Sequence, residues 1–361
     1  MPHSERRYSV LSVAYPLLPV HSGSAGGAEQ ILSLVDRGVT EAGHDSLVIA
    51  AAGSRIVGTL IQTQTFEGQI TEEMLARARE EHRDFIERTL RETRVDLIHL
   101  HGLDFYEYLP STSVPKVATL HLPIAWYPDH IFEIPGLELV CVSDAQATTL
   151  PERQRATTVR NGIDVAAFGG GCERGDFLLY LGRICPEKGA DIALRIAHQL
   201  ARRLVLAGPV HPFEYHQNYF REKVAPLLDD ERRYVGATGL LEKRKLLAQT
   251  QCLLIPSLVD ETSSLVAMEA MASGTPVIAF RRGALPEVVE HERTGFLVEN
   301  EGEMADAVEK TATISAAVCR ETALRRFDFR RMVDDYLGLY ERVLGGWLKR
   351  PASQAPAVVS K

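Results

Sequence analysis

Residues 261–279 read ETSSLVAMEAMASGTPVIA, and this stretch decides the fold class. An apolar run at 252–255 precedes it, and the stretch itself ends in a second apolar run at 277–280. Between the two runs, polar residues lead into an apolar segment at 264–273 that favours a helix. The order strand, loop, helix and strand is the repeating unit of a parallel sheet covered by helices. We therefore predict an α/β fold.

The same alternation extends in both directions along the chain. We predict strands at residues 8–15, 47–51, 95–100, 116–120, 137–143, 157–160, 177–181, 204–207 and 233–235, in addition to the two runs above. We predict helices at 28–42, 71–94, 188–202, 212–228, 242–249, 264–273, from 301 onward, and at 329–348. The pattern indicates two doubly wound halves.

A glycine-rich segment at 168–175 divides the halves and has the composition of a linker. We expect residues 1–167 to form an N-terminal Rossmann-like domain and residues 168–329 a C-terminal one. The helix at 330–348 could pack back on the first domain, and the Pro, Ala and Ser of 350–361 indicate a flexible tail. Ligands of such sheets bind at the carboxyl ends of the strands, so we expect them in a cleft between the halves.

Composition excludes several classes of protein. The net charge of the 361 residues is -8, which argues against a nucleic-acid partner. Five cysteines without a CxxC pair indicate reduced thiols rather than disulfides or a zinc site. The short apolar run after the first arginines is expected to be a strand and not a signal peptide. We expect a cytoplasmic protein, at most peripheral at the inner face of a membrane; the sequence does not indicate its oligomeric state.

Two carboxylates flank the start of the helix at 264–273. Glu261 lies in the loop before it, and Glu269 lies within it among apolar residues. A helix N-terminus binds anions through its free N–H groups. A buried carboxylate needs a polar partner. For Glu269 that partner is either a ribose or sugar hydroxyl pair or a neighbouring cation.

Two cations follow the first strand of the second half, in the segment Gly182-Arg183-Ile184-Cys185-Pro186-Glu187-Lys188-Gly189. Arg183 and Lys188 would lie at the carboxyl end of that strand, where they suit a diphosphate leaving group. The alternative is a pair of solvated surface cations. No D-x-D pair lies at a strand end, as a metal-dependent transferase would require.

Glycines also follow the first strand of the chain, where Gly26 and Gly27 precede Glu29 and a helix. Glycines there allow the backbone to approach a ligand closely. The alternative is a tight turn in which Glu29 supports the helix N-terminus.

Three histidines lie at or near strand ends. His121 follows the strand at 116–120, and a lone histidine at such a place is usually structural. His99 and His101 share one face of another strand. We expect His99 in the core and His101 towards the ligand, with no role assigned to either.

These segments resemble the retaining family-4 glycosyltransferases of the GT-B fold, in the expected order and over essentially the whole chain. The stretch at 261–279 is similar to the family's E-x7-E region, with Ser263-Ser264 where Phe-Gly is usual, and this departure affects the sugar contacts. The other matches are G-R-x-x-x-E-K-G at 182–189, G-G-x-E at 26–29, T-x-H at 119–121, H-x-H at 99–101 and N-G-I-D at 161–164.

The resemblance implies two Rossmann-like domains facing each other across a cleft, the first binding the acceptor and the second the nucleotide-sugar. It implies transfer from an NDP-sugar, with UDP favoured, to a hydroxyl of a glycan, lipid-linked or secondary-metabolite acceptor. Retention of the anomeric configuration, a front-face mechanism and independence of metals and cofactors are implied as well. The implied catalytic residues are Glu261, Arg183, Lys188 and His121, and the implied donor-binding residues are Glu269, Gly26, Gly27, Ser263, Ser264, Leu265 and Gly182.

Three alternatives share the expected fold. An inverting GT-B transferase and a sugar-nucleotide epimerase are compatible with two doubly wound halves, but they do not explain the order of the motifs. A non-enzymatic two-lobed sugar-binding protein would need a signal peptide and does not explain why Arg183 and Lys188 accompany the two glutamates.

Overall fold

The computed structural model describes residues 7–24, 26–64, 71–169 and 174–348, and side chains of the last helix only up to residue 346. Residues 170–173 of the predicted linker and the whole predicted tail therefore lie outside the described residues. The chain forms two compact units. One comprises the residues up to Arg160 together with those from Arg330 onward, and the other comprises Asn161–Phe329.

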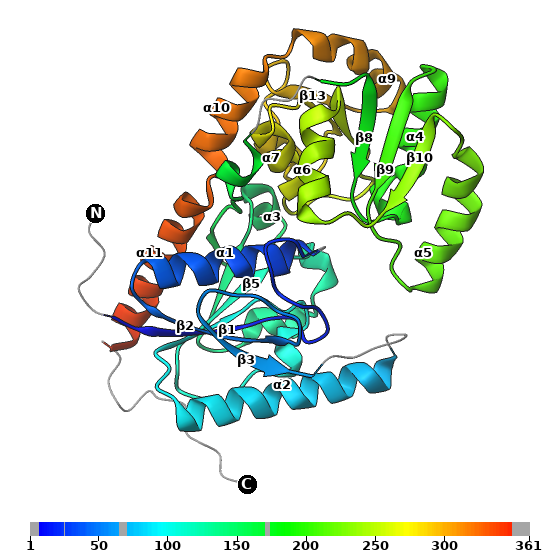
Figure 1. Cartoon of the computed structure of the whole chain (residues 1–361). Helices are drawn as coiled ribbons and strands as arrows, with labels where there is room; N and C mark the ends of the chain where they lie inside the picture. The colour runs from blue at the N-terminus through cyan, green and yellow to red at the C-terminus, as the bar shows by residue number, and fades with distance from the viewer. Residues whose placement is uncertain (1–6, 25, 65–70, 170–173, 349–361) are drawn as a thin grey trace. The chain divides into compact units, whose positions relative to one another are not determined.

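The first unit contains a parallel sheet with the strand order β3-β2-β1-β4-β5-β6-β7. Its strands are β1 (Ser9–Val13), β2 (Asp45–Ala51), β3 (Thr59–Thr63), β4 (Leu97–Leu100), β5 (Lys116–Leu120), β6 (Leu137–Cys141) and β7 (Thr157–Thr158). Its helices are α1 (Gly27–Glu41), α2 (Glu72–Glu92), α3 (Asp144–Thr148) and all but the first residue of α11 (Phe329–Leu348). Figure 1 shows α1 and α2 on opposite faces of this sheet, which explains why β1, β4 and β5 are buried throughout.

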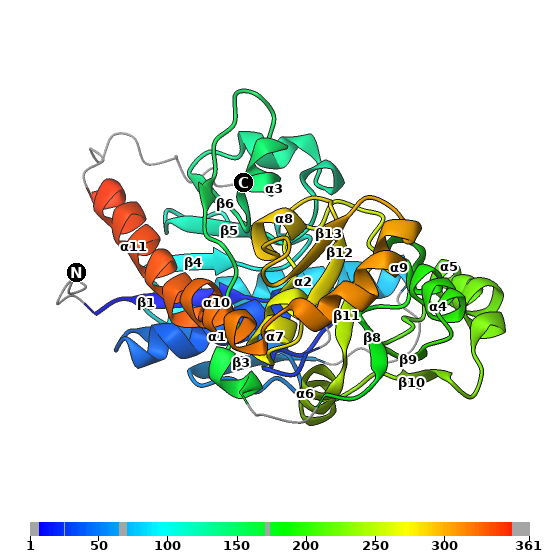
Figure 2. The same cartoon turned by 90° about the horizontal axis from the view of Figure 1, so that it is seen from above.

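The second unit contains a parallel sheet with the order β10-β9-β8-β11-β12-β13. Its strands are β8 (Phe177–Leu181), β9 (Arg203–Ala207), β10 (Arg232–Gly236), β11 (Cys252–Ile255), β12 (Val277–Phe280) and β13 (Gly295–Val298). Its helices are α4 (Ala190–Gln199), α5 (Glu214–Tyr219), α6 (Leu240–Gln249), α7 (Leu265–Ala272), α8 (Leu285–Val288), α9 (Glu301–Lys310) and α10 (Ala316–Phe327). Helices α4 and α9 pack side by side (Figure 2), and α7 packs against α6 and α10.

The predicted elements are present, with several differences. The sequence missed β3, an edge strand whose side chains are exposed or half-buried except that of Thr63, and the short buried β13. It also missed the short helices α3 and α8. The helix predicted at 212–228 is wrong as one element: α5 gives way to a π-helical turn at Phe220–Val224 and a 3-10 turn at Ala225–Leu227. Pro226 has no N–H to continue an α-helix. Residues 161–168 pack with the second unit, whereas the sequence assigned them to the first domain.

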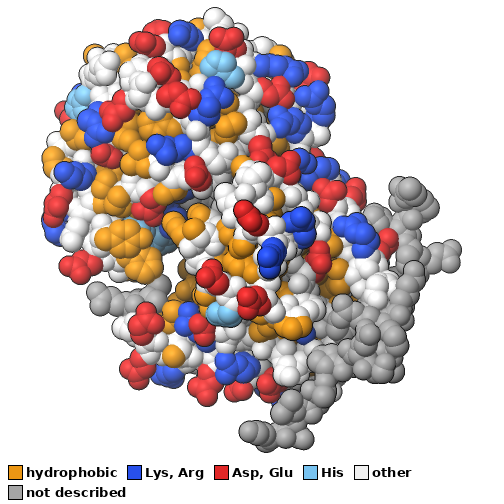
Figure 3. Space-filling view, turned by 180° about the vertical axis from the view of Figure 1, so that it is seen from behind, with side chains coloured by type: hydrophobic (Ala, Val, Ile, Leu, Met, Phe, Trp, Pro, Cys, Tyr) orange, Lys and Arg blue, Asp and Glu red, His pale blue; other side chains and the backbone are white. Residues whose placement is uncertain are grey.

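Charges of both signs are mixed on the surface. On the face that Figure 3 shows, Lys and Arg side chains lie among Asp and Glu side chains. This mixture agrees with the net charge of -8 and offers no basic face on that side for nucleic acid. None of the described helices is long and apolar enough to cross a bilayer.

Candidate functional site

The loop after β8 carries both predicted cations. Gly182 opens it and donates its N–H to the carbonyl of Ala207 at 3.0 Å. The next residue, Arg183, is half-buried, and its carbonyl oxygen accepts a hydrogen bond of 2.8 Å from the Tyr180 hydroxyl. Within the described part of the chain no carboxylate lies within ion-pair distance of the Arg183 guanidinium. Arg183 is therefore a cation held by its backbone and available to an anionic ligand.

The second predicted cation, Lys188, forms an ion pair with Glu261. Its Nζ lies 2.6 Å from Oε1 of Glu261, and both side chains are largely buried. The pair joins the loops after β8 and β11, which are adjacent strands of the parallel sheet. Since the carboxyl ends of parallel strands meet at one edge, two residues 73 positions apart come into contact there.

The same edge holds the N-terminus of α7. The first N–H groups of a helix, here beginning with Leu265, lack an intrahelical acceptor. Ser264, the residue before the helix, accepts no capping hydrogen bond from them through its side chain. Ser263 precedes it, and its hydroxyl is buried without a hydrogen-bond partner among the described residues. Free amides and a buried free hydroxyl at one helix start suit a phosphate or a sugar hydroxyl.

Glu269, also predicted at this site, has a protein partner. Lys243 of α6 lies with its Nζ 2.5 Å from Oε1 of Glu269; Glu269 is buried, and the Lys243 side chain is largely buried. Burial raises the pKa of Glu269, and the Lys243 cation partly offsets that rise. Of the two partners considered for Glu269, the structure shows the neighbouring cation. Lys243 could not be predicted as that cation, because the residue pattern of α6 does not indicate that it packs against α7.

In the first unit, Gly26 is the residue before α1 and Gly27 begins the helix. The Glu29 side chain folds back over Gly26 so closely that a Cβ at that position would lie 1.9 Å from Oε2 of Glu29. Glu29 is buried, and burial raises the pKa of its carboxyl group. The structure therefore places a buried acidic side chain in the first turn of α1, folded over Gly26.

His121 lies directly after β5, at the carboxyl edge of the first unit's sheet, and belongs to a chain of hydrogen-bonded side chains. Its Nε2 lies 3.2 Å from Nδ1 of His101, whose Nε2 lies 3.1 Å from Nδ1 of His99. The His99 nitrogens also contact the Tyr340 hydroxyl at 2.6 Å and Thr119 Oγ1 at 2.8 Å. Desolvation lowers the pKa of His99 to about 3, so its ring is neutral.

The histidine chain corrects one expectation. His99 lies in the core as predicted, but His101 is also buried, with 1% of its surface exposed, between the other two rings. Tyr336 and Tyr340 of α11 complete the network, and Tyr336 reaches Thr119 at 2.9 Å. Sequence reasoning missed both tyrosines because they are more than 200 positions from their partners.

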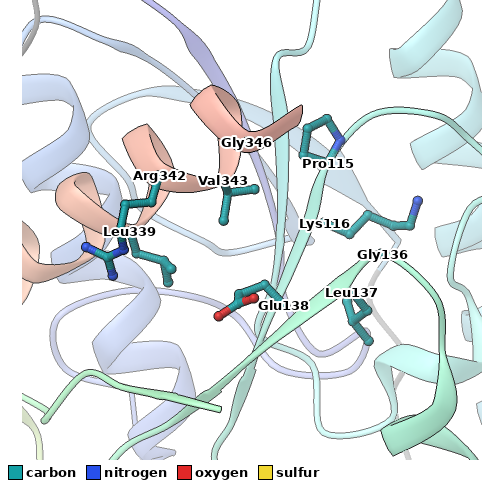
Figure 4. Close-up of a pocket in the computed structure, with 9 residues that line it drawn as sticks. All are labelled: Pro115, Lys116, Gly136, Leu137, Glu138, Leu339, Arg342, Val343 and Gly346. Carbon is teal, nitrogen blue, oxygen red and sulfur yellow. The ribbon is translucent and has the colours of Figure 1, made fainter. Parts of the chain in front are cut away.

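A separate hollow lies at the opposite edge of the first sheet, at the start of β5 and β6 (Figure 4). Lys116 and Glu138 line it together with Arg342 of α11. The Lys116 ammonium donates to the carbonyl of Thr112 at 2.8 Å, and Glu138 accepts the Thr157 hydroxyl at 2.8 Å. The hollow lies at the amino ends of the strands, whereas His121 follows the carboxyl end of β5.

A protein-family model described as glycosyl transferases group 1 matches residues 175–313, which hold Arg183, Lys188, Glu261 and Glu269. The D-inositol 3-phosphate glycosyltransferase of Saccharomonospora viridis is 31% identical over 189 residues, 47% of this chain and 43% of that protein. The enzyme of the same name from Stackebrandtia nassauensis is 27% identical and matches 63% of this chain and 61% of its own length. The chain thus spans about half the length of the curated relatives that it matches.

Solved structures cover nearly the whole chain. AviGT4, a glycosyltransferase involved in avilamycin A biosynthesis, superposes with a TM-score of 0.71 at 25% identity, and the alignment covers 94% of this chain and 98% of AviGT4. The sucrose-phosphate synthase of Thermosynechococcus elongatus has a TM-score of 0.78 at 18% identity, covering 94% and 100%. Anabaena HepE in complex with UDP and glucose has a TM-score of 0.71 at 19% identity, covering 92% and 99%. The predicted fold class, GT-B with two Rossmann-like parallel-sheet domains, is confirmed.

Proposed function

We propose that this chain, which belongs to the glycosyl transferases group 1 family through residues 175–313, transfers a sugar from an NDP-sugar to an acceptor hydroxyl. The observation that carries the proposal is the 2.6 Å ion pair of Lys188 and Glu261. The loop that carries Lys188 also carries Arg183, which has no ion-pair partner among the described residues. A diphosphate needs fixed cations and a sugar needs hydrogen-bond acceptors, and this edge of the sheet supplies both.

The donor is proposed to occupy the carboxyl edge of the second sheet. Its diphosphate would accept hydrogen bonds from the first amides of α7 and from Ser263, and Arg183 and Lys188 would balance its charge. Glu261 would hold hydroxyls of the donor sugar. Glu269 would bind ribose hydroxyls through its second oxygen while Lys243 keeps the first, since the ion pair engages Oε1. UDP is favoured as the nucleotide because the structurally similar HepE binds UDP and UDP-glucose.

The transfer is proposed to retain the anomeric configuration through a front-face substitution. The bond between the anomeric carbon and the diphosphate oxygen breaks, the acceptor oxygen bonds to the same face of that carbon, and the acceptor proton passes to the departing diphosphate. Arg183 and Lys188 stabilise the charge that builds on the leaving group, so the step needs no catalytic metal or cofactor. His121, with Gly26 and Gly27, is proposed to contact the transferred sugar from the first unit.

The acceptor is a hydroxyl of a glycan, lipid-linked or small-molecule substrate. A small molecule is favoured because AviGT4, at 25% identity, takes part in the biosynthesis of one. The names of the curated relatives point to a phosphorylated polyol, so D-inositol 3-phosphate belongs in the first acceptor panel.

The test begins with thermal shift against UDP-, GDP- and ADP-sugars, because a bound donor raises the melting temperature by mass action. The stabilising donor is then incubated with the acceptor panel, and the product anomer is assigned by NMR. We expect stabilisation by a UDP-sugar and a product with the donor's anomeric configuration. Inversion would establish an inverting transferase, a changed sugar without acceptor would establish an epimerase, and binding without turnover would establish a sugar-binding protein. Each of these results contradicts the proposal.

A further inference from the structure

The loop after β8 also carries two side chains that the proposed transfer does not use. Cys185 and Glu187 lie two positions apart in this loop, and His216 lies on α5, the segment after β9. The thiol, one carboxylate oxygen and one ring nitrogen all lie within 4.8 Å of one another. We propose that these three side chains bind one divalent transition-metal ion of the zinc type, which ties the loop to α5.

His216 gives the independent evidence for a ligand. The residue is fully buried, yet neither ring nitrogen has a hydrogen-bond partner among the described residues. The ring is held by the aromatic side chains of Tyr215, at 4.2 Å between centroids, and Phe213, at 5.4 Å. Its Nε2 lies 4.0 Å from Oε1 of Glu187, too far for a hydrogen bond and close enough for both to reach one ion. Buried polar groups without partners are rare, and a bound ion would satisfy this one.

The geometry suits a small tetrahedral ion. Bonds of about 2.0–2.3 Å place the ligand atoms of zinc roughly 3.3–3.8 Å apart, so metal binding would draw the three ligand atoms together from their present spacing of up to 4.8 Å. One sulfur, one nitrogen and one carboxylate oxygen favour Zn²⁺ or Co²⁺ over Mg²⁺ or Ca²⁺, which prefer oxygen ligands. Three protein ligands leave the fourth position to water.

The charge balance also allows an ion beside the donor loop. The thiolate of Cys185 and the carboxylate of Glu187 together neutralise the charge of a divalent ion, so the occupied site would not repel the Arg183 guanidinium. Lys188 is already paired with Glu261. The ion is assigned no step in sugar transfer: it fixes the loop whose backbone positions Arg183, and the inference does not depend on the proposed function.

Local cysteine spacing argued against a zinc site, since the chain has no CxxC pair. The trio instead unites two segments that are distant in sequence, which that argument did not cover. The rival explanation is a trio held only by hydrogen bonds between the Cys185 thiol and the Glu187 carboxylate, with no affinity for metal.

Cobalt spectroscopy distinguishes the two. Protein without a histidine tag, stripped with a chelator and dialysed, is titrated with Co²⁺ and monitored for thiolate-to-cobalt charge-transfer absorption. We expect saturation at one Co²⁺ per chain and loss of the signal when Zn²⁺ is added. Cys185→Ser should abolish the charge-transfer band, and His216→Ala should weaken Co²⁺ binding at least about tenfold. Cys319→Ala, which removes another buried thiol, should leave both unchanged.

Melting temperature gives a second readout. Excess Zn²⁺ should raise it for the wild type and for Cys319→Ala but not for Cys185→Ser. If Cys185→Ser does not fold, Glu187→Gln keeps the shape of the side chain while removing its charge, and it should bind Co²⁺ at least about tenfold more weakly. Absence of the charge-transfer band in the wild type, or a band that persists in Cys185→Ser, would overturn the proposal.

Discussion

The hydroxyl of Tyr340 lies 2.6 Å from Nδ1 of His99, and both side chains are completely buried. This hydrogen bond connects α11 to β4, although 241 positions separate the two residues. It begins a chain that continues through His101 to His121 at the edge of the sheet. The last helix therefore contributes to the position of a proposed sugar-site residue.

Tyr340→Phe should lower the free energy of unfolding by about 1 kcal/mol, the usual contribution of a buried hydrogen bond. The loss stays modest because Nδ1 of His99 retains its contact with His101. Urea denaturation measures the effect. Tyr8→Phe is the matched control, because the Tyr8 hydroxyl is buried without a partner among the described residues and its removal should cost nothing. An equal decrease in the free energy of unfolding in both variants would show that the hydrogen bond of the Tyr340 hydroxyl does not stabilise the fold.

Gly208 supports the donor loop through its backbone. Its φ is +141°, and a Cβ there would lie 1.8 Å from the carbonyl oxygen of Gly182. Gly208→Ala should therefore cost about 1–3 kcal/mol and displace Gly182. Gly345→Ala, where a Cβ meets nothing within 4 Å inside α11, should instead stabilise the protein by about 0.5–1 kcal/mol. Denaturation of the two variants under one set of conditions checks the opposite signs, and a neutral Gly208→Ala would contradict the close approach.

Arg183→Ala should reduce kcat by about 10²–10³-fold, because it removes a fixed cation from the departing diphosphate. The melting temperature should stay unchanged, since Arg183 holds no ion pair in the described part of the chain. Arg203→Ala, which removes an exposed arginine at the amino end of β9, is the control and should retain full activity. Wild-type turnover by Arg183→Ala would refute the donor site.

Which strands and helices could be predicted from the sequence depended on how deeply their residues are buried. The bounds of β5, β8, β11 and β12 match the predicted ranges, and β8, β11 and β12 are short apolar runs bounded by polar or turn residues. The strand β3 escaped prediction because its exposed edge carries polar residues such as Thr59 and Gln62 that give no apolar signal. The helix predicted at 212–228 ran through Pro226, although a proline within a helical pattern argues against one continuous helix.

The candidate site was predictable where its parts are local in sequence. Arg183, Lys188 and Glu261 could be identified because each lies just after a strand, and strand ends meet at one edge of the sheet. Partners that tertiary packing brings together could not be identified. Lys243 pairs with Glu269 across two helices, and Tyr340 reaches His99 from the far end of the chain. No pattern within one element specifies such contacts.

The two members of the Lys188–Glu261 pair should differ in their kinetic effect. Lys188→Ala removes a diphosphate contact that exists in the ground state and strengthens in the transition state, so it should raise the KM for the donor and also lower kcat. Glu261→Gln keeps the shape of the side chain and should mainly lower kcat, by about 10²-fold. Initial-rate kinetics with varied donor separate the two patterns, and Lys245→Ala, an exposed lysine of α6, should match the wild type. Identical effects of both substitutions on KM alone would mean that the pair only binds the donor.

The buried Glu269 predicts a specific dependence of stability on pH. Because burial raises its pKa in the folded protein, the native state binds a proton that the unfolded chain has released. Its favourable contribution is present below the ordinary carboxyl pKa of about 4.3 and is lost as pH rises through the folded value. Lys243 counteracts that rise, so in Lys243→Met the loss of stability should continue to higher pH and amount to about 3–5 kcal/mol at neutral pH.

Urea denaturation at a series of pH values measures both effects. Glu269→Gln combined with Lys243→Met should recover most of the lost stability and remove the added pH dependence. If Lys243→Met shows the same pH profile as the wild type, the ion pair does not control the charge of Glu269.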